Sequence, residues 1–370
     1  MRIVLFWSYY EGYVDRLYAR NPGLRNASYT EQRNAIISDY FGWPPSVVLR
    51  MAEQGHTVDV IVVNAEHLQR TWASENGVAF DEADWQRSLP LAQVRRFQPD
   101  VVWIGSMFRY YGEYLGTLKP LCKLLVAWIA CPMPPFLDLS HIDLILTHNS
   151  DMADNFRKVG KNSEQMFPAF EPRILDGMGE GGATVPVSFV GNLTWTHSRR
   201  VDFMRAIVER TPLEMWTEKP HYSWRSMLRP QFLPVYLKSR KLWSRSHPAV
   251  FGMDMYRVLA RSVMTVNVHG EGPAGRYGNM RTFEATGAGT LLLTESDRNL
   301  TRIFEPDKEV VAYTGLADLI GKIEGFLSQP QECARMAKAG QERVLRDHNT
   351  VLRARQLAAM LQDRLRSAAG

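Results

Sequence analysis

The residues best suited to chemistry lie between Met253 and Glu295. There a loop with four glycines, residues 269–279, leads into a predicted helix that carries Arg281 and Glu284. Glycine lets a phosphate approach the backbone closely, and helix-start amides with basic side chains stabilise its charge. A glutamate about one turn into the helix is within reach of a ribose hydroxyl pair. The pattern therefore predicts a site for a phosphate and a ribose.

Two α/β units must hold this loop. A predicted helix over Met253–Arg261 leads into an apolar strand over Val263–Val268, ahead of the loop. Behind it, the helix that opens near Asn279 ends at Gly287 and passes into an apolar strand over Leu291–Thr294. Strands that alternate with helices are typical of a parallel sheet, which binds ligands beyond the carboxyl ends of its strands.

Three residues of this helix also have purely structural explanations. Asn279 is a favourable N-cap residue, so capping alone is an alternative role for it. Arg281 and Glu284 are one turn apart on the same helix face, where a surface ion pair is the alternative.

A second candidate phosphate loop begins at Gly191-Asn192. It follows a predicted strand over Val187–Val190 and precedes a predicted helix over Arg200–Arg210, with His197 between them. The glycine permits close approach of an anion, and the nearby cations offset its charge. An ordinary βα turn is the alternative.

The segment from Asn279 to Thr294 also carries a family resemblance. It reads Asn-x-Arg-x-Phe-Glu-Ala and then Gly-x-x-Leu-Leu-Thr. This sequence motif resembles the C-terminal half of two-domain GT-B glycosyltransferases, most closely the "glycosyl transferases group 1" branch that includes CgeB-like spore maturation proteins. The resemblance covers about Val187 to Leu361, and in the first half it covers mostly the order of elements.

The resemblance implies a GT-B fold, in which two Rossmann-like, doubly wound α/β domains face each other across a cleft. It implies that Glu284 binds the ribose of a nucleotide and that Arg276 or Arg281 meets the diphosphate. Many retaining enzymes of this fold carry two glutamates eight positions apart, but Arg276 occupies the earlier position here. The stereochemistry therefore stays open. The expected donor-binding residues are Gly191, Asn192, His197, Arg200, His269, Arg276, Asn279, Arg281 and Glu284.

The whole chain predicts two domains. At 370 residues it is too long for one small core. We expect an N-terminal, acceptor-side domain over residues 1–175 and a C-terminal, nucleotide-sugar-binding domain over 186–345. The glycine-rich stretch 178–183 is the expected linker. A C-terminal helix over 346–370 resembles the terminal helices of the family, which cross back to the first domain.

An unusually long connection, about 37 residues, joins the first predicted strand, Ile3–Trp7, to the helix at Pro45. It contains Ser28-Tyr29-Thr30-Glu31, a capping box that predicts a helix start. One interpretation is a helical insertion that only covers the sheet. The other is an acceptor-binding element, with Tyr9 and Tyr10 on the acceptor side and Glu11 or, next, Asp39 as the catalytic base.

Composition excludes several classes of protein. The hydrophobic fraction of 45% is that of a globular protein, and no apolar run reaches membrane-spanning length. The start reads as a first strand rather than a signal peptide, and three scattered cysteines form neither a disulfide framework nor a metal site, so we expect a cytoplasmic protein. The net charge of +5 suits anionic substrates, but no nucleic-acid-binding motif accompanies it.

Residues 219–253 form a basic stretch in which Trp224, Phe232, Tyr236 and Trp243 are interleaved with arginines and lysines. A solvated basic insertion is one interpretation. The other is a patch that binds an anionic membrane surface, which would place the protein peripherally at the inner face of the membrane.

These observations together predict a glycosyltransferase that moves a sugar from a nucleotide-diphosphate donor to a hydroxyl of a glycan or glycolipid. No cofactor is expected, and no metal, because helix amides and cations replace it and no Asp-x-Asp pair follows a strand. A nucleotide-sugar epimerase or hydrolase, and a non-catalytic nucleotide-sugar-binding protein, are alternatives. A dehydrogenase is disfavoured, since no Gly-x-Gly-x-x-Gly motif follows a strand with an acidic residue about 20 positions on.

Overall fold

The computed structural model describes residues 1–10, 12–131, 133–134, 137–179, 181–193, 198–218, 240–269, 279–297 and 299–369. The chain divides into two compact units: unit 1 is Met1–Glu171 with His348–Gly370, and unit 2 is Pro172–Asp347. It passes into unit 2 ahead of the glycine-rich stretch that we expected to be the linker, and it returns to unit 1 at His348.

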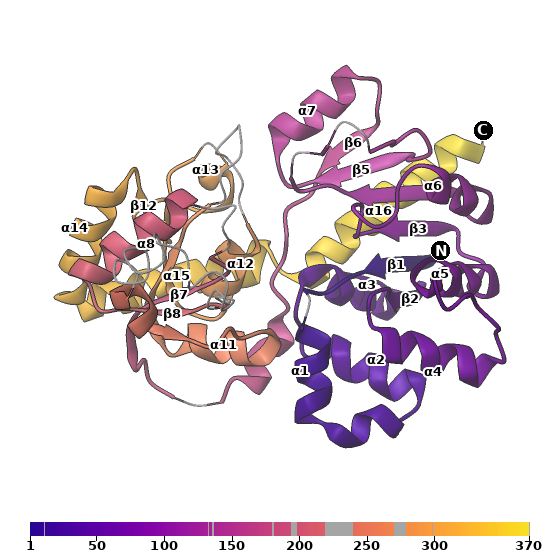
Figure 1. The fold of residues 1–370 in the computed structure, drawn as a ribbon. Helices are drawn as coiled ribbons and strands as arrows, with labels where there is room; N and C mark the ends of the chain where they lie inside the picture. Colours follow the sequence, from indigo (N-terminus) through magenta and orange to yellow (C-terminus); the bar gives the residue numbers. More distant parts are fainter. Residues whose placement is uncertain are drawn as a thin grey trace, which may run out of the picture. The chain divides into compact units, whose positions relative to one another are not determined.

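Unit 1 is built on a six-stranded parallel sheet with the order β2-β1-β3-β4-β5-β6 (Figure 1). Its strands are β1 (Arg2–Trp7), β2 (Thr57–Val62), β3 (Val101–Ile104), β4 (Leu124–Trp128), β5 (Leu144–Thr147) and β6 (Ser163–Gln165). Its helices are α1 (Tyr13–Arg20), α2 (Tyr29–Ile37), α3 (Trp43–Glu53), α4 (Glu66–Asn76), α5 (Trp85–Phe97), α6 (Glu113–Leu118), α7 (Ser150–Lys158) and α16 (Thr350–Ala369), with short 3-10 turns at Pro22–Asn26 and Lys119–Leu121.

Unit 2 repeats this architecture. Its six described strands are parallel and run in the order β12-β11-β10-β7-β8-β9. They are β7 (Val185–Val190), β8 (Leu213–Trp216), β9 (Ser246–His247), β10 (Ser262–Asn267), β11 (Leu291–Glu295) and β12 (Val311–Tyr313). The helices are α8 (Ser198–Arg210), α11 (Gly252–Ala260), α12 (Met280–Gly287), α13 (Leu300–Ile303), α14 (Leu316–Leu327) and α15 (Pro330–Asp347), after a 3-10 turn at Pro172–Gly177.

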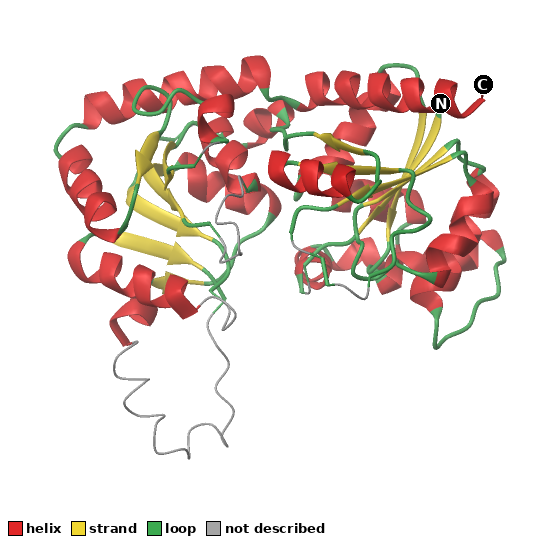
Figure 2. Cartoon of the chain, turned by 90° about the horizontal axis from the view of Figure 1, so that it is seen from above, coloured by secondary structure: helices red, strands yellow, loops and turns green. Residues whose placement is uncertain are grey.

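The apolar runs explain why the strands are central. All four residues of β3 and the first four of β4 are buried, as in a parallel sheet that is covered on both faces. Helices flank each sheet (Figure 2). Two doubly wound α/β units were expected from the alternation of the sequence, and both are present.

The long connection after β1 is helical. It forms α1, the turn at Pro22–Asn26 and α2. The capping box predicted at Ser28 is confirmed, since its side chain accepts a hydrogen bond from the Glu31 amide and the Glu31 carboxylate accepts one from the Ser28 amide.

The C-terminal stretch from Pro330 forms two helices, α15 and α16, and the second corresponds to the helix predicted over 346–370. It breaks at His348 and Asn349, where the backbone pairs with Phe170: the Phe170 amide donates to the His348 carbonyl at 2.9 Å, and the Thr350 amide donates to the Phe170 carbonyl at 2.9 Å. This pairing competes with helical hydrogen bonds at the break. Beyond it, α16 packs against α3 within unit 1.

A buried carboxylate secures this part of unit 1. Glu171, 2% exposed, accepts a hydrogen bond from Nε of Arg50 on α3 at 3.1 Å and from Oγ1 of Thr350 at 2.7 Å. The Glu171 carboxylate, where the chain leaves unit 1, therefore binds both α3 and Thr350, close to where the chain re-enters unit 1.

Within the described ranges, none of the helices has both the length and the apolar character needed to span a membrane.

We expect Glu171→Ala to lower the free energy of unfolding of unit 1 by about 3 kcal/mol, because it leaves the largely buried guanidinium of Arg50 without its buried partner. Glu53→Ala is the matched control, since Glu53 binds the same arginine but is half exposed, and its loss should cost about 0–1 kcal/mol. Urea unfolding followed by tryptophan fluorescence measures both. Equal losses in the two variants would contradict the assignment.

Candidate functional site

Three neighbouring strands of unit 2 end at the same edge of their sheet. β10 lies between β7 and β11, and all three are parallel. Gly191 and Asn192 follow β7, while Val268 and His269 follow β10. The two loops predicted from the sequence therefore begin side by side, as the strand-end rule for such sheets requires.

Arg200 joins these two strand ends. From the first turn of α8, its Nη1 donates to the carbonyl of Asn192 at 3.2 Å and its Nη2 donates to the carbonyl of Val268 at 2.8 Å. The guanidinium thus places a fixed positive charge where β7 and β10 end.

Arg281 and Glu284 form an ion pair on α12. Nη1 of Arg281 lies 2.9 Å from Oε2 of Glu284, so the predicted one-turn spacing is confirmed. The pair is not on the surface, because the two side chains are only 15% and 8% exposed. Nε of Arg281 also donates to the carbonyl of Val190 at 3.1 Å, which holds the pair against the end of β7.

The electrostatics of Glu284 reflect this position. Burial raises the pKa of its carboxyl, while the neighbouring Arg281 guanidinium lowers that pKa and favours the charged form. The carboxylate has a single ion-pair partner among the described residues and retains lone pairs that can accept hydrogen bonds from a ligand.

Asn279 occupies the N-cap position of α12, but its side chain does not cap the helix. Its Nδ2 donates to Oδ1 of Asn267 at 2.8 Å, and Nδ2 of Asn267 in turn donates to Oγ1 of Thr294 on β11 at 3.1 Å. The side-chain amide of Asn279 therefore links α12 to the end of β10 and, through Asn267, to the end of β11. The first amides of α12 receive no side-chain acceptor from the N-cap residue, and that of Thr282 donates to the Asn279 carbonyl at 3.2 Å, with those of Met280 and Arg281 before it at the helix start.

His269 is buried beside two carboxylates. Its Nδ1 lies 3.5 Å from Oε2 of Glu295 and 3.8 Å from Oδ2 of Asp297, and its backbone amide donates to Glu295 at 2.7 Å. Burial lowers the pKa of the imidazole, and the two carboxylates act in the opposite direction. Sequence reasoning missed both acids, although Glu295 is the last residue of β11, which pairs with β10, and Asp297 lies two residues beyond it.

The remaining donor-side residues, His197 and Arg276, lie outside the described residues, as does most of the glycine loop. Among the described residues, no three His, Cys, Asp or Glu side chains gather in a group that could hold a metal ion.

The acceptor-side candidates belong to unit 1. Glu11 lies outside the described residues. Asp39 accepts a hydrogen bond from the Tyr13 hydroxyl at 2.8 Å, and the ring of Tyr13 packs on that of Tyr9 with centroids 4.8 Å apart. Burial, with the Asp39 charge in addition, raises the pKa of Tyr9. Tyr10, in contrast, is 68% exposed.

Residues 199–359 match the sequence model of a family described as "Glycosyl transferase-like". No protein of curated function matches the chain.

Solved structures resemble the chain over nearly its full length. The Anabaena protein Alr3699/HepE in complex with UDP-glucose has a TM-score of 0.60 at 12% identity, covering 98% of this chain and 100% of that one. Sucrose-phosphate synthase from Thermosynechococcus elongatus has a TM-score of 0.59 at 11% identity, with 98% of each chain covered. AviGT4, a glycosyltransferase involved in avilamycin A biosynthesis, has a TM-score of 0.58 at 14% identity, covering 99% of this chain and 98% of that one.

The expected likeness to GT-B glycosyltransferases is thereby confirmed, while the narrower likeness to CgeB-like proteins stays a prediction. The chain has the GT-B fold, and its residues 199–359 match the glycosyl transferase-like family.

Proposed function

We propose that this protein is a glycosyltransferase that transfers a sugar from a nucleotide-diphosphate donor to a hydroxyl group of a glycan or glycolipid. The observation that carries the proposal is the buried Arg281–Glu284 pair held at the end of β7, beside Arg200 and within the family-matched region. Fold likeness alone would not justify an activity.

The chemistry of transfer fits these groups. As the bond between sugar and diphosphate breaks, negative charge builds on the leaving diphosphate and must be stabilised. Arg200, Arg281 and the amides at the start of α12 are placed at one sheet edge to do so. Glu284 accepts hydrogen bonds from the ribose hydroxyls, and its ionised form is favoured by Arg281.

The likeness to solved structures supports the donor class. HepE was solved with UDP and glucose and with UDP-glucose, and the E. coli trehalose-6-phosphate protein was solved with UDP-2-fluoro glucose. We infer that the donor here is likewise a nucleotide-diphosphate sugar, bound by unit 2.

Unit 1 then supplies the acceptor side. For an inverting reaction we propose Glu11, or else Asp39, as the base that takes the acceptor proton. Asp39 has the orienting partner that a base needs, since the Tyr13 hydroxyl donates to it. A retaining reaction would need neither residue.

We further propose that the protein works in the cytoplasm at the inner face of the membrane, with the basic stretch 219–253 as its contact. Residues 219–239 lie outside the described residues. Arg240 and Lys241 are exposed, whereas Trp243 packs against the hydrophobic core. Support for the contact therefore comes from the basic side chains and not from this aromatic one.

A screen of UDP-, GDP-, dTDP- and CMP-sugars tests the donor side. A donor at about 100 times its Kd should stabilise the protein by about 2.7 kcal/mol in a thermal-shift assay. Turnover of that donor is expected to continue in EDTA, because protein cations and amides replace a metal. Loss of turnover that manganese or magnesium restores would contradict metal independence, and turnover that proceeds fully without an acceptor would favour the epimerase or hydrolase alternative.

Glu284→Ala should weaken nucleotide binding by about 1.5–3 kcal/mol, the size of a hydrogen bond to a charged group. Calorimetry with the nucleotide found in the screen measures this change. Glu324→Ala is the control, since Glu324 is a half-exposed glutamate of α14 in the same unit. Unchanged affinity in a folded Glu284→Ala protein would remove this residue from the site.

Charge reversal tests the membrane contact. Wild type should bind anionic vesicles at low salt and lose binding by a few hundred millimolar, since each basic residue near an anionic surface contributes about 1 kcal/mol within a Debye length. Replacing Arg240 and Lys241 by Glu should reduce binding, while reversal of Arg335 and Lys338, exposed on α15, should not. If wild type ignores anionic vesicles at low salt, the stretch is a solvated insertion, and the result favours a soluble glycan or protein as the acceptor over a membrane-held one.

A further inference from the structure

Unit 1 contains a cavity of about 470 Å³ that the donor site does not use. It lies at the carboxyl ends of three adjacent strands, because its lining includes Tyr10 after β1, Asn64 after β2 and Arg109 after β3. Its volume falls within the range of about 300–1,000 Å³ that is usual for small-molecule sites.

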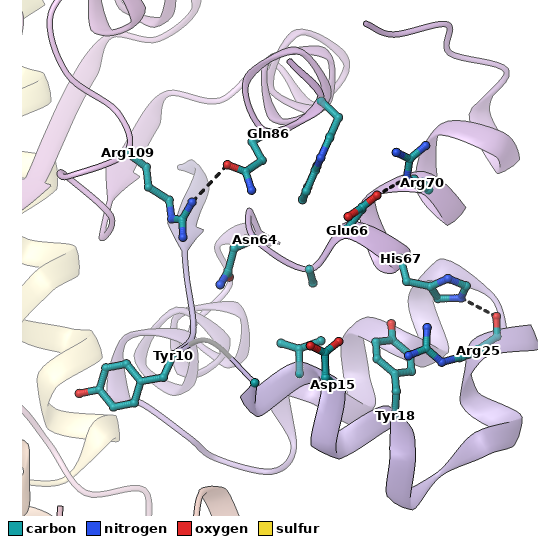
Figure 3. Close-up of a pocket in the computed structure, with 14 residues that line it drawn as sticks. Tyr10, Asp15, Tyr18, Arg25, Asn64, Glu66, His67, Arg70, Gln86 and Arg109 are labelled. Carbon is teal, nitrogen blue, oxygen red and sulfur yellow. Dashed lines mark hydrogen bonds and ion pairs between the residues drawn. The ribbon is translucent and has the colours of Figure 1, made fainter. Parts of the chain in front are cut away.

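The lining is polar. Of the 14 residues that line it, Val14 and Ala65 are the aliphatic ones (Figure 3). Asn64 and Gln86 offer amides that both donate and accept hydrogen bonds, and Asp15 offers a carboxylate that accepts them. Trp85 adds an aromatic side chain with an apolar face. This combination suits a ligand rich in hydroxyl groups and does not suit a lipid chain.

The charges in the cavity are unequally neutralised. Arg70 is occupied by two acids, with Nε 2.8 Å from Oε1 of Glu66 and Nη2 2.6 Å from Oε2 of Glu82. Arg25 and Arg109 have no acidic partner within the part of the chain that the structure describes. Arg25 lies over the ring of Tyr18 at 4.9 Å, and Nη1 of Arg109 donates to the neutral amide of Gln86 at 3.1 Å.

In Figure 3, Arg109 and Gln86 lie on one side of the space and Arg25 and His67 on the other. Because Glu66 and Glu82 together exceed the charge of Arg70 by one, and Asp15 adds another negative charge, the formal charges of the cavity balance. They are unevenly placed, since Arg109 has a neutral amide and not an acid as its partner among the described residues.

Three helices also begin at this cavity. Gly12, Ala65 and Asp84 are the N-cap residues of α1, α4 and α5, and none of their side chains accepts a hydrogen bond from its helix. The first residues of each helix line the cavity: Val14 and Asp15, Glu66 and His67, Trp85 and Gln86. Each helix start carries about half a positive charge. In α1 and α4 an acid of the first turn, Asp15 or Glu66, offsets it, so the start of α5 is the one that reinforces Arg109.

We propose that this cavity binds a sugar that carries one acidic group, a carboxylate or a phosphate, with Arg109 as the residue that selects the acid. Asn64, Gln86 and Asp15 bind the hydroxyl groups. The role of the cavity as an acceptor subsite rests on the proposed function, whereas its selectivity for an acidic sugar does not.

Saturation-transfer NMR on the full chain tests the proposal, with glucose, glucuronate and glucose 6-phosphate as observed probes and inorganic phosphate, which has no carbon-bound protons, as a competitor against them. Glucuronate and glucose 6-phosphate should bind about tenfold more tightly than glucose, because each gains a charge-assisted hydrogen bond. The carboxylate and phosphate arms tell which acid is preferred. Equal binding of glucose and both acidic sugars, or binding of inorganic phosphate as tight as that of the sugars, overturns it.

Arg109→Gln should abolish the tenfold preference, and Arg25→Gln should reduce it if the first variant does not fold. Arg96→Gln is the matched control: it removes the same charge from an exposed position of α5 outside the cavity. Preference retained in folded Arg109→Gln and Arg25→Gln overturns the proposal.

Glu284→Ala separates this site from the donor site, because it should leave sugar binding unchanged; a loss of glucuronate binding in that variant would place the sugar in unit 2 and overturn the proposal. Donor turnover without glucuronate or glucose 6-phosphate binding sinks the cavity assignment alone. Arg109-dependent binding of an acidic sugar without any donor turnover upholds the cavity assignment and counts against the proposed transferase.

Discussion

The parallel pairing of β10 with β7 on one side and β11 on the other decides which residues of unit 2 can meet. Parallel strands end at one edge, so residues far apart in the chain, such as Asn192, His269 and Glu295, arrive at the same place. Side chains then connect the strand ends: Arg200 spans β7 and β10, and Asn267 spans β10 and β11. The core beneath them, which includes Met264, is mostly apolar, and a buried hydrogen bond of 3.0 Å between Ser188 on β7 and Thr265 on β10 adds to the register that the polar edge needs.

Burial strengthens the electrostatic interactions among the polar groups at this edge of the sheet. In water the Arg281–Glu284 pair would contribute little, but here both side chains are largely shielded, and an unpaired charge would be costly. The pair therefore depends on its partners staying in place, including the Val190 carbonyl that receives Nε of Arg281. In unit 1 the cavity is partly open to solvent, and two of its three arginines, Arg25 and Arg109, have no acidic partner among the described residues.

Local signals in the sequence predicted much of the fold. The strands predicted over Ile3–Trp7 and Leu291–Thr294 are present as β1 and β11 and differ by one residue at one end, because short apolar runs of this kind fit a sheet covered on both faces. Spacing alone also predicted that Arg281 and Glu284 would meet. What could not be predicted depends on strand order: only the neighbourhood of β10 and β11 brings Asp297 to His269. The wall of the unit 1 cavity was missed for a local reason, since α5 contains Pro90, a residue that disfavours a helix interior.

The hydrogen bonds that hold Arg200 in the folded chain affect how tightly a ligand anion can bind. A free arginine side chain loses up to about 2 kcal/mol of rotamer entropy when it becomes ordered. Here the carbonyls of Asn192 and Val268 have already ordered the guanidinium in the folded chain. This entropy is therefore lost when the chain folds and not when a ligand binds. A ligand anion meets a preorganised cation, and more of its interaction energy appears as affinity. Unit 2 accordingly carries part of the thermodynamic cost of recognition before any ligand arrives.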